Sequence, residues 1–248
     1  MRLLQLFITV IAICLLVTSC SKESNNEAAA GTGTGGSLAR FTIAANHLYL
    51  ADYNRLEVYD LANPANPVKK TPVELGWGIE TIFPYGDKLF IGSADGMFIY
   101  SIANPSAPVK LGEARHLRSC DPVVAKDNIA YVTLQGSGRC GAATDGLYIY
   151  DVSNITSPVQ KSLLEMSTPY GLGIKDSVAF ICRRDKGLTV VNVKSPTAPK
   201  IMYTKTDAPA YLDVIPVDNI LLCYVSTGLL IYDISNLHTI VKVGEMDY

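Results

Sequence analysis

The chain has 248 residues, of which 48 % are hydrophobic and 18 % are charged, and its formal net charge is −2. These values are typical of a globular protein with one large or two small domains. The lack of a basic excess argues against a nucleic-acid partner, and the lack of an acidic run argues against a disordered acidic tail.

Residues 1–19 predict a lipoprotein signal peptide. Arg2 is followed by an apolar run, Leu3–Val17, and the sequence Val-Thr-Ser-Cys that ends at Cys20 is typical of a lipobox. In such a sequence Cys20 receives the lipid, palmitate included, and becomes the first mature residue. The alternative is a retained membrane helix, for which the run is short, because a spanning helix needs about 20 apolar residues.

Residues 20–36 predict a flexible tether. They are rich in Gly, Ala, Ser and Asn and contain no large apolar side chain, so they cannot bury enough surface to offset chain entropy. A lipid anchor followed by a tether presents a folded domain outside the cytoplasm. We therefore expect a bacterial cell-envelope location, on the periplasmic or outer-membrane surface, with membrane attachment through the lipid.

The remaining residues, 37–248, repeat one turn sequence five times. The copies are YDLANPANPV (59–68), YSIANPSAPV (100–109), YDVSNITSPV (150–159), VNVKSPTAPK (191–200) and YDISNLHTIV (232–241). They start 41, 50, 41 and 41 residues apart. Within each unit, Gly, Asp and Pro separate four short apolar runs, a pattern of strands joined by tight turns. The period and the strand number predict an all-β fold, a β-propeller of five four-stranded blades.

The repeated turn has an architectural interpretation. Asp60, Asp151 and Asp233 are placed to cap the turn with hydrogen bonds to the backbone. Because no strand is left over at either end, we expect the ring to close by packing of the first blade on the last, without exchange of a strand between the chain ends.

The repeat resembles the LVIVD-repeat family of secreted and surface-attached propellers. The resemblance lies in GLYIYDVSNITSP (146–158) and GLLIYDISN (228–236), and more weakly in GMFIYSIANPSAP (96–108). It implies a propeller exposed at a cell surface, and it implies no particular activity.

Four cysteines remain after the signal peptide and the lipidated cysteine. Cys120 begins an inner strand, and Cys140 lies in a nine-residue insertion of the third unit. The four-strand arrangement places both on one rim, so we expect a disulfide in an oxidising compartment; the alternative is two unrelated buried thiols. Cys182 and Cys223 lie in second strands of successive units and are expected to be buried, unbridged apolar residues.

Polar and aromatic residues gather in the loops that share one face of the predicted ring. Such groups at the mouth of a rigid ring are usual components of a binding site; the alternative is an ordinary solvated rim. The candidate residues are Trp77, Glu80, Arg115, His116, Arg118, Asp121, Tyr170, Arg183, Arg184, Tyr211 and Asp213.

The sequence favours a binding or interaction module over an enzyme. It contains no nucleophile elbow, metalloprotease, phosphate-loop or calcium-loop motif, so we expect no cofactor and no metal. The expected partner is a protein or a glycan. Two alternatives stay open: a surface glycan hydrolase that uses channel carboxylates such as Glu80 and Asp213, and a purely structural envelope protein.

Overall fold

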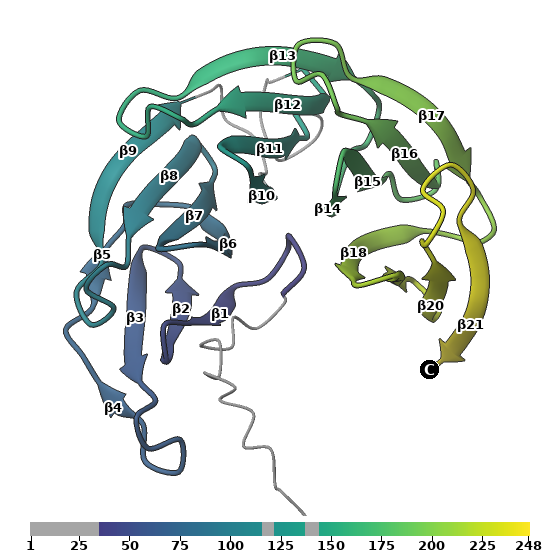
Figure 1. Cartoon of the computed structure of the whole chain (residues 1–248). Helices are drawn as coiled ribbons and strands as arrows, with labels where there is room; N and C mark the ends of the chain where they lie inside the picture. The colour runs from purple at the N-terminus through teal and green to yellow at the C-terminus, as the bar shows by residue number, and fades with distance from the viewer. Residues whose placement is uncertain (1–34, 116–121, 137–143) are drawn as a thin grey trace, which may run out of the picture.

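The computed structural model describes residues 35–115, 122–136 and 144–248, and it shows strands wound into blades around a central axis (Figure 1). Five antiparallel sheets follow one another along the chain, so the predicted five-bladed, all-β propeller is confirmed. In each sheet the strand order in space equals the order in sequence. No helix in the described part of the chain is long and apolar enough to cross a membrane.

Each blade is a four-stranded meander whose first strand lies nearest the axis. Blade 1 contains β1 (Phe41–Ala44), β2 (His47–Asp52), β3 (Arg55–Asp60) and an outer strand in two pieces, β4 (Val68–Lys69) and β5 (Val73–Glu74). Blade 2 contains β6 (Ile79–Tyr85), β7 (Lys88–Ser93), β8 (Gly96–Ser101) and β9 (Val109–Arg115). Blade 3 contains β10 (Val123–Lys126), β11 (Ile129–Leu134), β12 (Gly146–Asp151) and β13 (Val159–Glu165).

The last two blades follow the same plan. Blade 4 contains β14 (Leu172–Lys175), β15 (Val178–Cys182), β16 (Leu188–Asn192) and β17 (Lys200–Lys205). Blade 5 contains β18 (Tyr211–Val217), β19 (Ile220–Val225), β20 (Gly228–Asp233) and β21 (Val241–Asp247).

The turn between the third and the outer strand is capped as the repeat predicts. Asp60 accepts a hydrogen bond from the backbone N–H two residues later at 2.8 Å, Asp151 does so at 3.0 Å and Asp233 at 2.8 Å. Asn192 and Ser101 occupy the same position in blades 4 and 2 and accept the equivalent bond. The repeated turn is therefore an architectural motif that directs the chain to the outer edge of each blade.

Four apolar clusters hold consecutive blades together, one at each interface from blade 1 to blade 5. Between blades 4 and 5, for example, Phe180, Cys182 and Leu188 pack in one cluster with Tyr211 and Leu221, and all five are fully buried. Apolar burial of this kind is the main stabilising contribution in a stack of sheets.

The ring is open between blade 5 and blade 1 (Figure 1). In the described part of the chain no apolar cluster joins these two blades. Tyr224 lies on the face of blade 5 that no other blade covers, which we call the free face of blade 5, and it is 46 % exposed. Phe41 of blade 1 is 59 % exposed. The expected closure by packing of blade 1 on blade 5 is therefore wrong. The expected absence of strand exchange is correct, because β21 completes blade 5 and β1 pairs with β2.

The segment before β1 crosses the axis and links blades that are distant in sequence. Ser37 Oγ donates to Asp213 Oδ1 at 3.0 Å in blade 5 and accepts from the backbone N–H of Leu172 at 2.7 Å in blade 4. The carbonyl of Ala39 accepts from the N–H of Ile82 in blade 2 at 2.8 Å. This axial segment, residues 35–39, bridges the two sides of the open ring.

Candidate binding site at the mouth of the ring

A cavity of about 330 Å³ lies at the rim where the inner strands of blades 2, 3 and 4 begin, and we call it the mouth cavity. Its lining comes from three blades and from the axial segment. The lining residues are Leu38, Glu80, Thr81, Pro122, Gln135, Tyr170 and Arg184. Glu80, Tyr170 and Arg184 are three of the residues that the sequence places in a binding site.

Arg184 is the most distinctive group of the mouth cavity. Its guanidinium lies over the ring of Tyr170, 4.1 Å from the ring centroid, which is a favourable cation–π geometry. Its backbone is fixed by two hydrogen bonds with Tyr211, at 3.1 and 3.0 Å. The φ angle of 50° places Arg184 in the left-handed region, which a non-glycine residue adopts only when its surroundings hold it there.

The Arg184 side chain is exposed, and none of the ion pairs among the described residues includes it. The nearest carboxylate in sequence, Asp185, pairs instead with Lys186 at 3.0 Å. The contact with Tyr170 holds the guanidinium at the mouth cavity. A planar cation held in this way is suited to bind a carboxylate or a phosphate through two parallel hydrogen bonds.

Three other candidates lie outside the mouth cavity. Arg183 donates to the carbonyl and the hydroxyl of Ser167 at 3.0 and 2.8 Å. Arg115 pairs with Glu113 at 2.7 Å. Trp77 is 72 % exposed and packs edge-on against the Tyr53 ring, with 5.4 Å between centroids. The structure therefore separates these side chains from the group that contains Arg184.

The side chain of Tyr211 does not point to the rim, contrary to the expectation from sequence. Its side chain is fully buried, and its hydroxyl donates to Asp207 at 2.6 Å and lies 3.0 Å from the hydroxyl of Tyr232. Burial and the hydrogen bond to Asp207 raise the pKa of Tyr211. Its role is structural, within the interface of blades 4 and 5.

Asp213 also differs from the expectation, because its carboxylate holds the axial segment. It accepts hydrogen bonds from Ser37 Oγ at 3.0 Å and from the N–H of Leu38 at 3.3 Å, and it does not line the mouth cavity. Burial raises the pKa of Asp213 to about 6. Gly36 permits this approach, since a Cβ there would lie 2.1 Å from Asp213 Oδ2. Glu80 therefore does not share the cavity with Asp213.

Several candidates fall outside the described residues: His116, Arg118, Cys120, Asp121 and Cys140. The Cys120–Cys140 disulfide stays a prediction.

The two other cysteines, Cys182 and Cys223, are free and buried, as expected, and burial raises the pKa of both thiols. Within the described part of the chain no group of three or more His, Cys, Asp or Glu side chains is arranged to hold a metal ion.

Sequence reasoning missed four of the residues that line the mouth cavity: Leu38, Thr81, Pro122 and Gln135. Gln135 follows the second strand of blade 3 directly before the insertion, so the insertion itself was the available signal. Leu38 belongs to the axial segment, and no sequence feature predicts that this segment crosses the ring.

The fold and its polar mouth cavity define the chain as a β-propeller of the kind that presents loops from several blades around one opening. The resemblance to the LVIVD-repeat family is confirmed, because the LVIVD repeat matches residues 35–74 and 118–164, which include blade 1 and most of blade 3. No curated protein matches the sequence.

Solved structures with the same fold are distant in sequence. The chain is similar to the computationally designed Ika8 protein, with a TM-score of 0.60, 13 % identity and coverage of 84 % of this chain and 60 % of that one. A protein from Lactobacillus plantarum gives a TM-score of 0.64, 13 % identity and coverages of 82 % and 69 %. A hypothetical selenium-binding protein from Sulfolobus tokodaii gives a TM-score of 0.54 and 12 % identity, with coverage of 82 % of this chain and 59 % of that one. The chain thus spans three fifths of the designed protein, and these similarities concern the fold alone.

Proposed function

We propose that this protein is a lipid-anchored binding module of a bacterial cell envelope, and that its mouth cavity receives an acidic group of a protein or glycan partner. The observation that carries the proposal is the exposed guanidinium of Arg184, oriented on Tyr170 at the mouth of a rigid ring. A partner carboxylate would gain charge-assisted hydrogen bonds there without any rearrangement of the site.

The geometry favours binding over glycan hydrolysis. A glycosidase needs two carboxylates that flank the scissile bond, and Asp213, the candidate partner of Glu80, is engaged by Ser37 and Leu38. The axial segment also occupies the position where an open channel would lie. The alternative of a purely structural envelope protein predicts that no ligand binds, so a binding experiment distinguishes it from a binding module.

Arg184→Ala is expected to weaken partner binding by about 10- to 100-fold, the effect of losing a charge-assisted contact. The measurement is a glycan and peptide array probed with the chain from residue 21 onward, followed by calorimetry on each binder. Arg55→Ala is the matched control, since Arg55 pairs with Glu57 on blade 1 and does not line the mouth cavity. Equal affinities for the wild type and Arg184→Ala, or no binder on either array, would remove the basis of the proposal.

Cys20→Ala is expected to abolish incorporation of labelled palmitate and to release the protein from the membrane fraction. The physical reason is that the lipid chains would supply the membrane affinity, since the tether contains no large apolar residue. The check is metabolic labelling and fractionation of cells that express the full-length chain, with Ser19→Ala, which keeps the cysteine, as control. Full membrane retention of the Cys20 variant would instead indicate a retained apolar helix.

A further inference from the structure

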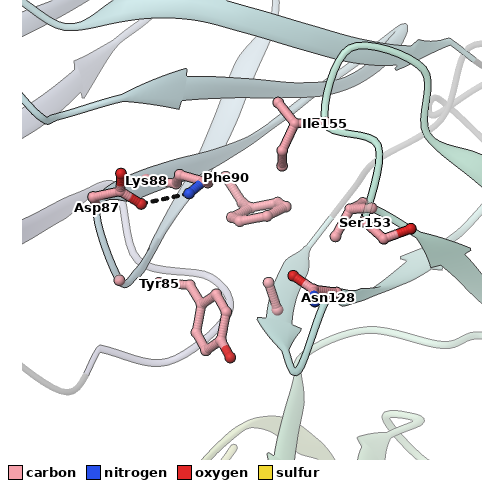
Figure 2. Close-up of a pocket in the computed structure, with 10 residues that line it drawn as sticks. Tyr85, Asp87, Lys88, Phe90, Asn128, Ser153 and Ile155 are labelled. Atoms are coloured by element: carbon pink, nitrogen blue, oxygen red, sulfur yellow. Dashed lines mark hydrogen bonds and ion pairs between the residues drawn. The ribbon is translucent and has the colours of Figure 1, made fainter.

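A second cavity opens on the opposite rim, between blades 2 and 3, and we call it the inter-blade pocket (Figure 2). Its volume is about 490 Å³, within the usual range for small-molecule sites. The inner wall is apolar: Ile155 is half-buried at its surface, and the buried side chains of Phe90, Ala125 and Val152 lie behind it. The rim is polar and carries Asp87, Lys88, Asn128 and Ser153.

The preceding interface shows how such a pocket is normally sealed. Between blades 1 and 2, His47 Nε2 lies 2.8 Å from Ser106 Oγ, and the Tyr49 hydroxyl donates to the carbonyl of Pro105 at 2.9 Å. Both side chains are buried. The hairpin of blade 1 is therefore joined to the outer loop of blade 2 by two polar contacts.

The equivalent residues cannot make this seal between blades 2 and 3. Lys88 opens β7 as His47 opens β2, and Phe90 occupies the position of Tyr49, 41 residues later in each case. Lys88 forms an ion pair with Asp87 beside it, and Phe90 has no hydroxyl to donate. Two changes of side chain thus explain why the rim of this interface stays open above its packed apolar cluster.

The chemistry of the pocket selects an amphipathic ligand. Figure 2 shows Asn128 and Ser153 facing Phe90 and Tyr85 across the opening. The Ser153 hydroxyl donates to Asp151 at 2.6 Å and keeps its accepting capacity. In the described part of the chain the Asn128 side chain makes no hydrogen bond. The rim therefore offers one cation, one anion and an amide next to the apolar inner wall.

We propose that the inter-blade pocket binds an apolar α-amino acid, with the apolar side chain of the ligand against the half-buried Ile155. The α-carboxylate meets the ammonium of Lys88 and the amide of Asn128, and the α-ammonium meets the carboxylate of Asp87. The ligand replaces the exposed Asp87–Lys88 pair, which contributes little by itself, by two ionic contacts with a partly desolvated partner. This site is separate from the mouth cavity and does not depend on its function.

The test is an NMR titration of the chain from residue 21 onward with L-phenylalanine and with L-leucine. We expect saturable shifts of the amide signals of Gly86, Asn128 and Ser153. N-acetyl-L-phenylalaninamide, which lacks both charges, is expected to bind at least about tenfold more weakly. Lys88→Gln, which changes a half-buried rim residue and leaves the apolar inner wall intact, is expected to weaken L-phenylalanine binding by about tenfold.

The sharpest variant restores the seal. Lys88→His combined with Phe90→Tyr reproduces the pair that closes the interface of blades 1 and 2, and it is expected to abolish binding while the thermal midpoint stays equal or rises. Undiminished binding in this folded double variant would overturn the proposal. So would the absence of saturable shifts in the wild type, or binding of glucose in place of the amino acids. If the double variant does not fold, unchanged affinity of Lys88→Gln for L-phenylalanine would overturn the proposal in its place.

Discussion

Leu188→Ala is expected to lower the free energy of unfolding by about 2–5 kcal/mol, whereas Leu229→Ala is expected to lower it by about 1 kcal/mol or less. The two leucines occupy the same position in blades 4 and 5, 41 residues apart. Leu188 is fully buried under blade 5, while Leu229 is half-buried on the free face of blade 5. Denaturant unfolding of both variants measures the difference between the two losses of stability. The same atoms are removed in each variant, so this difference reports the burial of the two sites.

This pair also tests whether the ring is open in solution. If blade 5 is covered there, by blade 1 or by another molecule, Leu229→Ala must leave a cavity as Leu188→Ala does. Comparable losses of stability, both above about 2 kcal/mol, would contradict the open ring.

The second large effect is a pH dependence that Asp213 creates. Burial raises its pKa to about 6 in the folded protein, from an ordinary value of 3.8. The folded state therefore binds a proton between these pH values when the unfolded state does not, so this group stabilises the fold as pH falls and the contribution is lost as pH rises through 6. The difference of about two pKa units corresponds to about 3 kcal/mol.

Asp213→Asn is the matched control, because the side chain keeps its shape and loses the titration. We expect the stability of the wild type, relative to that of Asp213→Asn, to increase by up to about 3 kcal/mol between pH 7 and pH 4. Other carboxylates whose pKa is lowered, such as Asp60 and Asp151, titrate equally in both proteins and cancel. A difference that stays constant with pH would show that the Asp213 carboxyl is not held in a buried site.

The fold was predictable because each blade repeats its turn chemistry. A hydrogen-bonding side chain at the position of Asp60, followed by proline at the start of the outer strand, recurs at a fixed spacing and specifies the blade locally. Such short-range signals survive in a single sequence since they depend on neighbours along the chain.

The open ring and the axial segment were not predictable, because they depend on contacts between residues far apart in sequence. Ser37 and Asp213 are separated by 176 positions, and neither belongs to the repeat. Ser37 stands in a Gly-rich stretch that is typical of a tether, and its hydroxyl is used only once blades 4 and 5 are in place.

The candidate site was predictable at the level of the rim and not at the level of individual side chains. Tyr170 and Arg184 lie in loops of the predicted face, so topology alone brings them to the mouth cavity. Tyr211 begins an inner strand of the same rim, but the pleat of β18 directs its ring into the core with Asp207 and Tyr232. The face of the sheet to which the first side chain of a strand points depends on the register of that strand. The repeat spacing does not fix this register at the first position of β18.

We propose that a partner binds at the mouth cavity. Hydrogen–deuterium exchange of the chain from residue 21 onward, with and without the tightest binder from the array, tests this claim most directly. We predict that the binder slows amide exchange around Thr81, Tyr170 and Arg184, and that exchange at the opposite rim, around Gly86 and Asn128, does not change. Protection confined to the opposite rim or to the free face of blade 5, with none at the mouth cavity, would contradict the account.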